Sequence, residues 1–250
     1  MIEVQSLVKT YGAFRAVDGV SLDVGAGEIH GFLGPNGAGK TTTIRVIAGL
    51  LKPTSGRVVL NGHDLAREPE KAKASLGFIP DRPFLYEKLT AGEFLQFHGG
   101  LYGMESRESR ERSLELLSLF ELSRWEGELV ESFSHGMKQR LVMCAAFLHK
   151  PKAVVVDEPM VGLDPRGARL IKDIFRSMSA RGVAILMSTH TLEVAQEMCD
   201  RISIILGGKI IARGTVPELR AQAGGEHDAL TGVFLKLTGG SGLQEIEDLV

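Results

Sequence analysis

The residues with the clearest chemical capability form one uninterrupted segment between positions 34 and 42. The segment consists of Gly34, Pro35, Asn36, Gly37, Ala38, Gly39, Lys40, Thr41 and Thr42. Its pattern, G-x-x-x-x-G-K-[ST], is that of a loop that binds nucleotide phosphates. Glycines let backbone N–H groups converge on a polyphosphate, whereas a Cβ atom would obstruct the approach. The segment therefore predicts that the chain binds a nucleoside triphosphate.

The sequence on both sides of this loop supports the prediction. An apolar run precedes it at residues 29–33 and a helical pattern follows it at residues 43–50, so the loop joins a strand to a helix. A helix that begins near Lys40 adds free N–H donors and the positive end of its dipole. Lys40 can then reach the β- and γ-phosphates, and the Thr41 hydroxyl can ligate Mg²⁺. The alternative, a chance match to the motif, does not account for this strand and helix.

Two adjacent carboxylates follow a second apolar run. Residues 154–156 are all valine, and Asp157 and Glu158 come directly after them. Ligands of open α/β sheets bind at the carboxyl ends of the strands. We therefore predict that Asp157 holds Mg²⁺, usually through water, and that Glu158 is the general base for the attacking water. The alternative is a solvated turn that has no catalytic role.

Two further side chains are candidates for contacts with the nucleotide. His190 ends the sequence Ser188-Thr189-His190 after another apolar run, which puts it at the same edge of the predicted sheet. We expect His190 to contact the γ-phosphate and to orient the transition state. Tyr11 precedes an early turn and can stack on adenine. Taken alone, an aromatic residue in such a place is more often part of the core or of the surface.

The start of a helix in the middle of the chain offers a second place for an anion. Residues 133–140 read FSHGMKQR, in which Ser134 supplies a capping hydroxyl and Gly136 an unobstructed N–H group. This segment lies in a helical region that cannot easily fold back onto its own phosphate loop, whereas a second chain can present it to the first chain's γ-phosphate. Local physics alone is equally consistent with an ordinary helix N-cap.

The order of apolar patterns predicts the fold that must position these residues. Alternating apolar and polar residues predict two antiparallel strands at residues 2–8 and 17–24. Short strands alternate with helices after Pro151, which indicates a parallel sheet with right-handed crossovers. We therefore predict an α/β fold: a P-loop NTPase core with a mostly parallel sheet, an antiparallel β subdomain at the N-terminal side, and an inserted helical subdomain at about 82–150.

This fold is expected to form one domain over residues 1–238. Helical patterns are predicted for residues 90–132, with Leu114, Leu117 and Phe120 on one apolar side, and for residues 136–149. Residues 239–250 begin with Gly-Gly-Ser-Gly and are predicted to be a flexible linker and a short acidic tail. The other predicted strands are residues 57–60, 76–80, 153–156, 183–188 and 202–206.

Composition narrows the class of protein further. The chain has 250 residues, 44% of them hydrophobic and 24% charged, which suits one large globular domain. Its formal net charge of -2 does not support bulk nucleic-acid binding. Cys144 and Cys199 lie in apolar, helical stretches, so we expect reduced core thiols. Neither a secretory signal nor an apolar run of about 18 residues is present, so we expect a soluble chain that is not exported.

The ordered set of motifs resembles the ATP-binding subunit of ABC (ATP-binding cassette) transporters. The motifs are Tyr11, GPNGAGKTT (34–42), FSHGMKQR (133–140), VVVDEP (154–159), VGLDP (161–165) and STH (188–190). The resemblance covers residues 2–220, and the segment 133–140 distinguishes this family from other P-loop proteins. It implies ATP as substrate and Mg²⁺ as cofactor. It also places Tyr11 on adenine, Lys40 and Thr41 on phosphate and Mg²⁺, Thr42 on the α-phosphate, and His190 as the switch histidine.

The same resemblance implies two kinds of partner. One is a second ATP-binding subunit, either the same chain or a paralogue, in a head-to-tail dimer that encloses two ATP molecules. Ser134 and Gly136 then contact the γ-phosphate of the opposite subunit, and Asp164 lies in the D-loop that crosses the interface. The other partner is a transmembrane permease that holds the chain at the cytoplasmic face of the cell membrane. Nucleic acid is not an expected partner.

Two departures from the family pattern affect these expectations. The family signature is usually LSGGQ, whereas Phe133, His135 and Met137 stand at its first, third and fifth places; the phosphate-facing Ser and Gly are intact. Asp81 replaces a Gln that normally senses Mg²⁺, and we expect this carboxylate to ligate Mg²⁺ or hold a water, with hydrolysis retained and metal coupling altered. Asp81-Arg82-Pro83, together with SHGMKQR, resembles ABC-2-type exporters more than importers.

Two other classes of protein remain as alternatives. A soluble ABC ATPase that acts on nucleic acid or ribosomes usually has paired cassettes or coiled-coil arms, whereas this sequence has one cassette, no extended heptads and no basic surplus. A P-loop kinase or GTPase does not explain residues 133–140, and the guanine-reading motif N-K-x-D does not occur. The sequence therefore favours an ATP-hydrolysing subunit that powers a separate membrane permease, in the direction of export.

Overall fold

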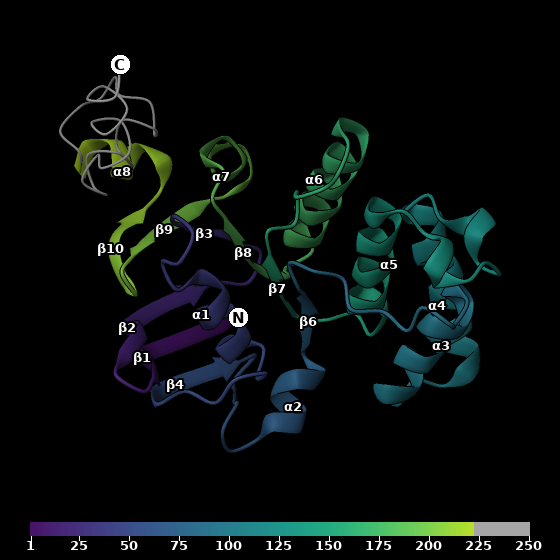
Figure 1. Ribbon diagram of the computed structural model, residues 1–250, viewed down its shortest axis with the longest axis horizontal. Coiled ribbons are helices and arrows are strands. Elements are labelled where there is room, and N and C mark those ends of the chain that lie inside the picture. The colour runs from purple at the N-terminus through teal and green to yellow at the C-terminus, as the bar shows by residue number, and fades with distance from the viewer. Residues whose placement is uncertain (223–250) are drawn as a thin grey trace.

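Two β-sheets organise residues 1–222, which are the residues that the computed structural model describes (Figure 1). The first sheet is antiparallel and has the strand order β2-β1-β4-β5. Ile2 and Val4 are buried at alternate positions, as the sequence predicted, and Leu7 is buried beyond a register shift that follows Val4. The antiparallel β subdomain is therefore confirmed. Its strands are β1 (Ile2–Tyr11), β2 (Phe14–Val24), β4 (Ser55–Leu60) and β5 (His63–Asp64).

The second sheet forms the core and has the strand order β10-β9-β3-β8-β7-β6. All of its strand pairs are parallel except β10 with β9. Every residue of β3, β7 and β8 is buried, as expected for a parallel sheet that is covered on both faces. The mostly parallel core is confirmed. Its strands are β3 (Ile29–Leu33), β6 (Leu76–Ile79), β7 (Ala153–Asp157), β8 (Ala184–Thr189), β9 (Arg201–Leu206) and β10 (Lys209–Gly214).

Helices from two parts of the chain surround the core sheet. The helices attached to the sheets are α1 (Lys40–Ile47), α2 (Pro69–Ala74), α6 (Pro165–Ala180), α7 (Leu192–Met198) and α8 (Val216–Gln222). The inserted helical subdomain lies between β6 and β7 in the sequence and to one side of the sheet in Figure 1. It comprises α3 (Ala91–Leu101), α4 (Ser106–Leu119), α5 (His135–Leu148) and two 3₁₀ helices (Ser123–Trp125 and Val130–Ser132). Because β6 and β7 pair directly, the insertion leaves the core sheet continuous.

One apolar cluster joins the helical subdomain to the core. The rings of Phe120 and Phe147 lie 6.0 Å apart, and Phe147 lies 6.3 Å from Phe175 of α6. Leu117 and Phe120 are buried as predicted, but Leu114 is 42% exposed. The prediction that Leu114 lies on the apolar side of this helix was therefore wrong, because the buried side of α4 runs through Leu116 and Leu117 instead.

The helix N-termini differ in how their free N–H groups are satisfied. Thr90 forms a capping box with Glu93 at α3, and the side chains of Ser134 and Asp164 cap α5 and α6. Helix α1 instead follows Gly39, whose φ is 106°, and it has no side-chain cap. The first N–H groups of α1 are therefore left for another acceptor.

Three predictions from the sequence concern membrane-spanning segments, the two cysteines and the C-terminal residues. Within residues 1–222, every helix is too short or too polar to cross a membrane. Both cysteines are free thiols, as predicted; Cys144 is buried in α5, whereas Cys199 directly follows α7 and is only partly buried. The predicted linker and acidic tail at 239–250 lie outside the described residues.

Candidate functional site

Three neighbouring strands bring the predicted site residues to one edge of the core sheet. In the order β3-β8-β7, the phosphate loop follows β3, His190 follows β8, and Glu158 follows β7. The register aligns Leu33 with Thr189 and Asp157 with Ser188, so these strands end side by side. The carboxyl edge of the sheet therefore assembles the phosphate loop, both carboxylates and the histidine, which lie far apart in the sequence.

The glycines of the phosphate loop are required by packing as well as by the proposed ligand. A Cβ atom on Gly34 would lie 2.4 Å from the carbonyl oxygen of Ile205, and one on Gly39 would lie 2.5 Å from that of Ala16. Gly37 has a φ of 79° and no neighbour within 4 Å of the corresponding position. The loop is thus held tightly from behind by β9 and β2 and is open at Gly37.

The backbone of the loop presents several free donors. Ala38 N–H donates to the Pro35 carbonyl at 3.2 Å, and the Ala38 carbonyl accepts from Gly208 N–H at 3.0 Å, which fixes the turn that contains Asn36. Within residues 1–222, no intramolecular acceptor is found for the N–H groups of Gly37, Gly39, Lys40 and Thr41. Thr41 and Thr42 lie in the uncapped first turn of α1. This arrangement of glycines and unpaired donors fits the phosphates of a nucleotide.

Lys40 is folded back onto its own loop. Its Nζ donates to the carbonyls of Gly34 at 2.6 Å and Pro35 at 3.1 Å, and it lies 4.0 Å from Oε1 of Glu158. Burial lowers the pKa of Lys40, while the charges of Glu158 and Asp157 oppose this shift. The ammonium group is therefore positioned at the loop and is only partly neutralised by nearby carboxylates.

Asp157 is a buried carboxylate with hydroxyl groups around it. Its Oδ1 accepts a hydrogen bond from the Ser188 hydroxyl, whose oxygen in turn accepts from Glu158 N–H at 3.0 Å. Burial raises the pKa of Asp157; hydrogen bonds from Ser188 and Thr41 oppose the shift, and the charge of Asp81 adds to it. Cation binding would offset the free energy of keeping this carboxylate ionised in the interior.

Thr41, Asp157 and Asp81 supply the oxygen atoms suited to Mg²⁺. Asp81 follows the carboxyl end of β6, next to β7, and its charge acts on Asp157. No group of three or more His, Cys, Asp and Glu side chains that could hold a metal occurs within residues 1–222. Mg²⁺ commonly binds through one or two carboxylates, water and substrate phosphates, so these three residues fit it without a complete protein cage.

Glu158 lies between Lys40 and His190. Its backbone is in the left-handed region at φ 52°, which is unusual for a residue other than glycine and stores conformational strain. Its Oε1 is 2.9 Å from His190 Nδ1 and 4.0 Å from Lys40 Nζ. The Glu158 side chain is 17% exposed and that of His190 is 51% exposed. One carboxylate oxygen of Glu158 thus lies near both the Lys40 ammonium group and the His190 ring.

Sequence reasoning missed the structural role of Ser188. The residue was noted only as part of Ser188-Thr189-His190, yet its hydroxyl connects Asp157 to the backbone of Glu158. A polar side chain near the end of the otherwise apolar strand β8 was the available signal. Its partners could not be predicted because they depend on the register between β7 and β8.

Tyr11 lies at the end of β1 in the antiparallel sheet. It ends β1 opposite Phe14 and is 48% exposed, and Lys9 Nζ lies 5.2 Å from the centre of its ring. It is connected to the phosphate loop through β2, since the Ala16 carbonyl of that strand packs on Gly39. The structure therefore leaves the ring of Tyr11 accessible for stacking.

Ser134 and Gly136 face a different part of the chain from the phosphate loop. The Ser134 hydroxyl accepts from Met137 N–H at 3.3 Å and caps α5, as predicted from the sequence. A Cβ atom on Gly136 would lie 3.8 Å from the Gly162 carbonyl, and one on Gly162 would lie 2.5 Å from the His135 ring. The start of α5 thus packs against the loop after β7, and no hydrogen bond within residues 1–222 joins Ser134 to the phosphate loop.

Asp164 lies at the end of the same loop. Its Oδ1 accepts from Gly167 N–H at 2.7 Å and caps α6, while the residue itself is exposed. Val161, three residues earlier, is 48% exposed. The segment from Val161 to Asp164 and the start of α5 therefore form one solvent-facing surface beside the site.

Comparison with known proteins identifies the family. Residues 17–161 match the ABC transporter family. The chain is 40% identical over 225 residues to the daunorubicin resistance ATP-binding protein DrrA3 of Streptomyces coeruleorubidus, covering 90% of this chain and 71% of that protein.

Solved structures agree with this assignment. An ATP-binding subunit of an ABC transporter superposes with a TM-score of 0.90 at 36% identity, covering 95% of this chain and 99% of the other. The dimeric, post-hydrolysis ATP-binding cassette MJ0796, bound to ADP and Pi, superposes with a TM-score of 0.80 at 26% identity, covering 86% of this chain and 99% of the other. This chain belongs to the ABC transporter family and is an ATP-binding, ATP-hydrolysing subunit.

Proposed function

We propose that two copies of this chain close head to tail around two ATP molecules and that each site needs residues from both copies. The phosphate loop, Asp157, Glu158 and His190 form one half of a site within a single chain. Ser134 is exposed and Gly136 half-buried, and within residues 1–222 no hydrogen bond joins the Ser134 side chain to that half. The dimeric arrangement of the MJ0796 cassette supports this proposal. Asp164, exposed on the same surface, is assigned to the interface between the copies.

Within one chain, some of the site residues bind the nucleotide and others act on the phosphate bond that is hydrolysed. The free N–H groups of the loop and Lys40 bind the phosphates, and Lys40 exchanges the Gly34 and Pro35 carbonyls for phosphate oxygens. Tyr11 stacks on adenine. The residues assigned to the nucleotide are Tyr11, Gly34, Pro35, Asn36, Gly37, Ala38, Gly39, Lys40, Thr41 and Thr42, with Ser134 and Gly136 from the second copy.

The cofactor of this reaction is proposed to be Mg²⁺. Thr41 and Asp157 would hold it, with Asp81 as a further ligand or as the acceptor of a bound water. When bound, Mg²⁺ neutralises charge on the phosphate oxygens. The raised pKa of Asp157 is consistent with this assignment, because a buried carboxylate that is costly to ionise gains most from a cation.

The observation that carries the catalytic assignment is the position of the Glu158 carboxylate. It lies 2.9 Å from His190 Nδ1 and 4.0 Å from Lys40 Nζ, at the open side of the loop. Glu158 accepts the proton of the attacking water as general base. His190 orients the Glu158 carboxylate and contacts the γ-phosphate, where it stabilises developing charge.

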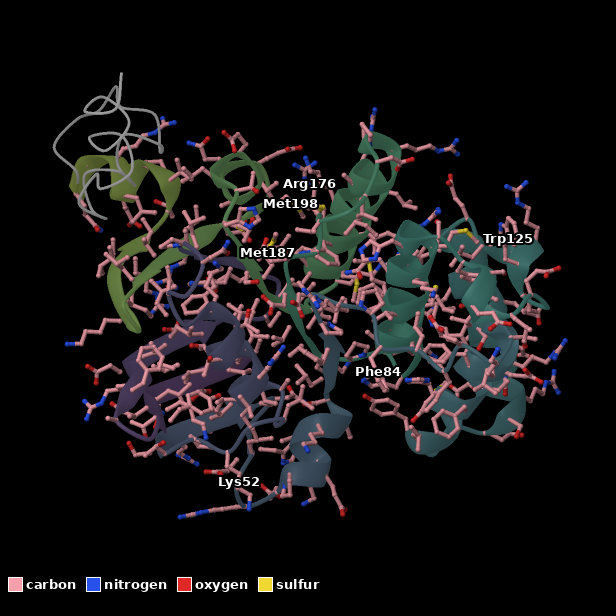
Figure 2. The ribbon with its side chains drawn as sticks, in the orientation of Figure 1. Lys52, Phe84, Trp125, Arg176, Met187 and Met198 are labelled. Atoms are coloured by element: carbon pink, nitrogen blue, oxygen red, sulfur yellow. The ribbon has the colours of Figure 1, made fainter. Side chains whose placement is uncertain are left out.

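The second partner is proposed to be a membrane permease that docks beside the core. A groove of about 930 Å³ lies between the core and the helical subdomain, and its lining includes Asp81, Phe84 and Tyr102. Phe84 is 82% exposed, and Figure 2 shows it between the two parts. Asp81 lines this groove, and its charge helps to raise the pKa of Asp157. Docking would place the chain at the cytoplasmic face of the membrane, and export is proposed by analogy with DrrA3, a resistance protein.

We also propose how the chain divides into domains. Residues 1–238 are proposed to be the ABC domain, with the helical insertion at about 82–150, and the linker and acidic tail predicted at 239–250 lie outside the described residues.

Co-purification tests the transport assignment. The tagged chain is isolated from gently solubilised membranes, and its partners are identified by mass spectrometry. We expect a protein with several membrane spans in near-equal amount, and Phe84→Ser should lose it while retaining ATP binding. Leu119→Ser is the matched control, because Leu119 is 48% exposed on α4 and does not line the groove. Recovery of soluble or nucleic-acid partners alone would contradict the transport assignment and leave the ATP chemistry intact.

A further inference from the structure

A second groove, of about 910 Å³, lies between the antiparallel sheet and α2. Its lining includes the basic side chains Lys52, Arg57, Arg67 and Lys73 and a single carboxylate, that of Asp64. We propose that this cationic groove binds an anion of the phosphate class, either a phosphate ester or a phosphorylated lipid headgroup. Its volume is in the range of small-molecule sites.

The carboxylate in the groove already accepts three hydrogen bonds. Asp64 Oδ2 accepts from Arg57 Nε at 2.5 Å, and Oδ1 accepts from the N–H groups of Ala66 at 2.9 Å and Arg67 at 3.2 Å. The hydrogen bond from Arg57 is the main cause of the lowered pKa of Asp64, which is therefore ionised near neutral pH. Asp64 orients Arg57 and the start of the 66–67 turn, and it forms no ion pair with the other cations of the groove within residues 1–222.

The remaining three cations lack a neutralising partner. Within residues 1–222, no carboxylate lies within 4.0 Å of the charged atoms of Lys52, Arg67 or Lys73. By contrast, Lys71, on the same helix as Lys73, is 2.8 Å from Glu68 and does not line the groove. In a chain with a formal net charge of -2, this leaves a local excess of positive charge in a concave surface. Such a surface concentrates anions.

The walls of the groove favour a phosphate ligand that also has an apolar part. Arg57 and Arg67 offer planar guanidinium groups, which suit the oxygens of a phosphate better than a point charge does. Leu51, Pro53 and Leu65 supply apolar surface between these cations. An ester of phosphate can therefore place its oxygens on the cations and its organic part on the wall.

The groove is separate from the ATP site. It touches Gly49, beyond the end of α1 at Ile47, whereas the phosphate loop lies at the opposite end of that helix. A Cβ atom on Gly49 would lie 2.6 Å from Cε of Lys73, so the Lys73 stem is packed across this glycine. Figure 2 shows Lys52 near the antiparallel sheet and α2, on the side away from α6 and α7. Binding here therefore does not require the phosphate loop.

Nuclear magnetic resonance of the full chain tests the proposal directly. Inorganic pyrophosphate is titrated into the Lys40→Ala chain, in which the phosphate loop lacks its ammonium group, while the amide signals of residues 49–73 are followed. We expect saturable shifts in this range, with affinity reduced at least about fivefold by Arg67→Gln or Lys73→Gln, since each removes a charge-assisted contact. Lys71→Gln is the matched control and should leave the affinity unchanged.

Flotation with vesicles distinguishes the two sources of phosphate. Binding to vesicles that contain phosphatidylglycerol, but not to vesicles of phosphatidylcholine alone, with loss in the Arg67 and Lys73 variants, would assign a lipid headgroup. Saturable pyrophosphate binding without flotation would assign a free phosphate compound instead of a lipid headgroup. The proposal is overturned if neither probe binds, or if Lys71→Gln weakens binding as much as Lys73→Gln.

Discussion

The two halves of the proposed ATP site differ in how completely a single chain forms them. At the carboxyl edge of the core sheet, Asp157, Ser188, Glu158 and His190 contact one another, and Lys40 lies 4.0 Å from Glu158. At the start of α5, Ser134 makes one local hydrogen bond and faces solvent. The first half is pre-organised by strand register, whereas the second has only a capped helix end. In the proposed function, one chain therefore prepares the catalytic residues and association with a second copy completes the site.

Replacing Glu158 should have the largest effect, because it removes the general base and leaves both halves of the site in place. Glu158→Gln should lower the ATP hydrolysis rate by about 10²- to 10⁴-fold. The variant should also accumulate as an ATP-bound dimer, since binding is retained and reopening is lost. Phosphate release and size-exclusion chromatography with ATP measure the two effects. Hydrolysis at the wild-type rate would show that another group is the base.

Replacing Lys40 should separate binding from catalysis. Lys40→Ala removes a charge-assisted contact worth about 1.5–3 kcal/mol, which corresponds to roughly 10- to 100-fold weaker ATP binding. Titration with a fluorescent ATP analogue gives the affinity of the monomer. A variant that binds ATP as tightly as the wild type would remove Lys40 from the phosphate contacts.

Replacing Asp157 should have the smallest effect. The effect is a gain in the stability of the fold, whereas the two replacements above cause losses of activity or binding. Burial raises the pKa of Asp157 above its ordinary value of 3.8, so folding disfavours the ionised form. This penalty is absent below the ordinary pKa, appears as the pH rises through it, and is complete above the raised pKa of the folded state. Asp157→Asn should therefore increase the free energy of unfolding at pH 7 in the absence of nucleotide, and the gain should shrink on acidification.

A matched control for this effect is Asp64→Asn in the cationic groove. The pKa of Asp64 is lowered, so its ionised form stabilises the fold above the ordinary pKa, and this contribution is lost as the pH falls through the lowered value. Asp64→Asn should therefore decrease the free energy of unfolding at pH 7. Urea unfolding at several pH values measures both variants. A loss of stability in both would contradict the description of Asp157 as a penalised buried charge.

The sequence predicted the features that depend on contiguous residues. The phosphate loop, the Asp157–Glu158 pair and the Ser134 cap are each encoded within a few positions, and so is the alternation that defines β1 and β2. The short, half-polar edge strand β10 was not predicted, because it gains its identity only by pairing with β9. The direction of the Leu114 side chain was wrong for a similar reason, since helix packing decides it.

Features that depend on register or on distant packing could not be read in advance. Ser188 connects Asp157 and Glu158 only because β7 and β8 align at that point. The need for Gly34 and Gly39 to accommodate the carbonyls of Ile205 and Ala16 follows from the fold and not from the motif. The cationic groove likewise gathers side chains from Lys52 to Lys73 that show no pattern in the sequence.

The central claim, that each ATP site is completed by a second copy of the chain, is tested most directly by mixing two inactive variants. Lys40→Ala disables the phosphate loop, and Gly136→Asp places a carboxylate where the second copy meets the γ-phosphate. The fold should tolerate the latter, because a Cβ atom there has no neighbour closer than 3.8 Å. A mixed dimer then contains one intact loop opposite one intact Gly136.

We expect each variant to be inactive alone and an equimolar mixture to hydrolyse ATP at up to about a quarter of the wild-type rate, because half of randomly paired dimers are mixed and each holds one complete site of two. Hydrolysis by the mixture at no more than the mean rate of the separate variants would contradict the account, since sites formed within one chain stay defective however the chains are paired.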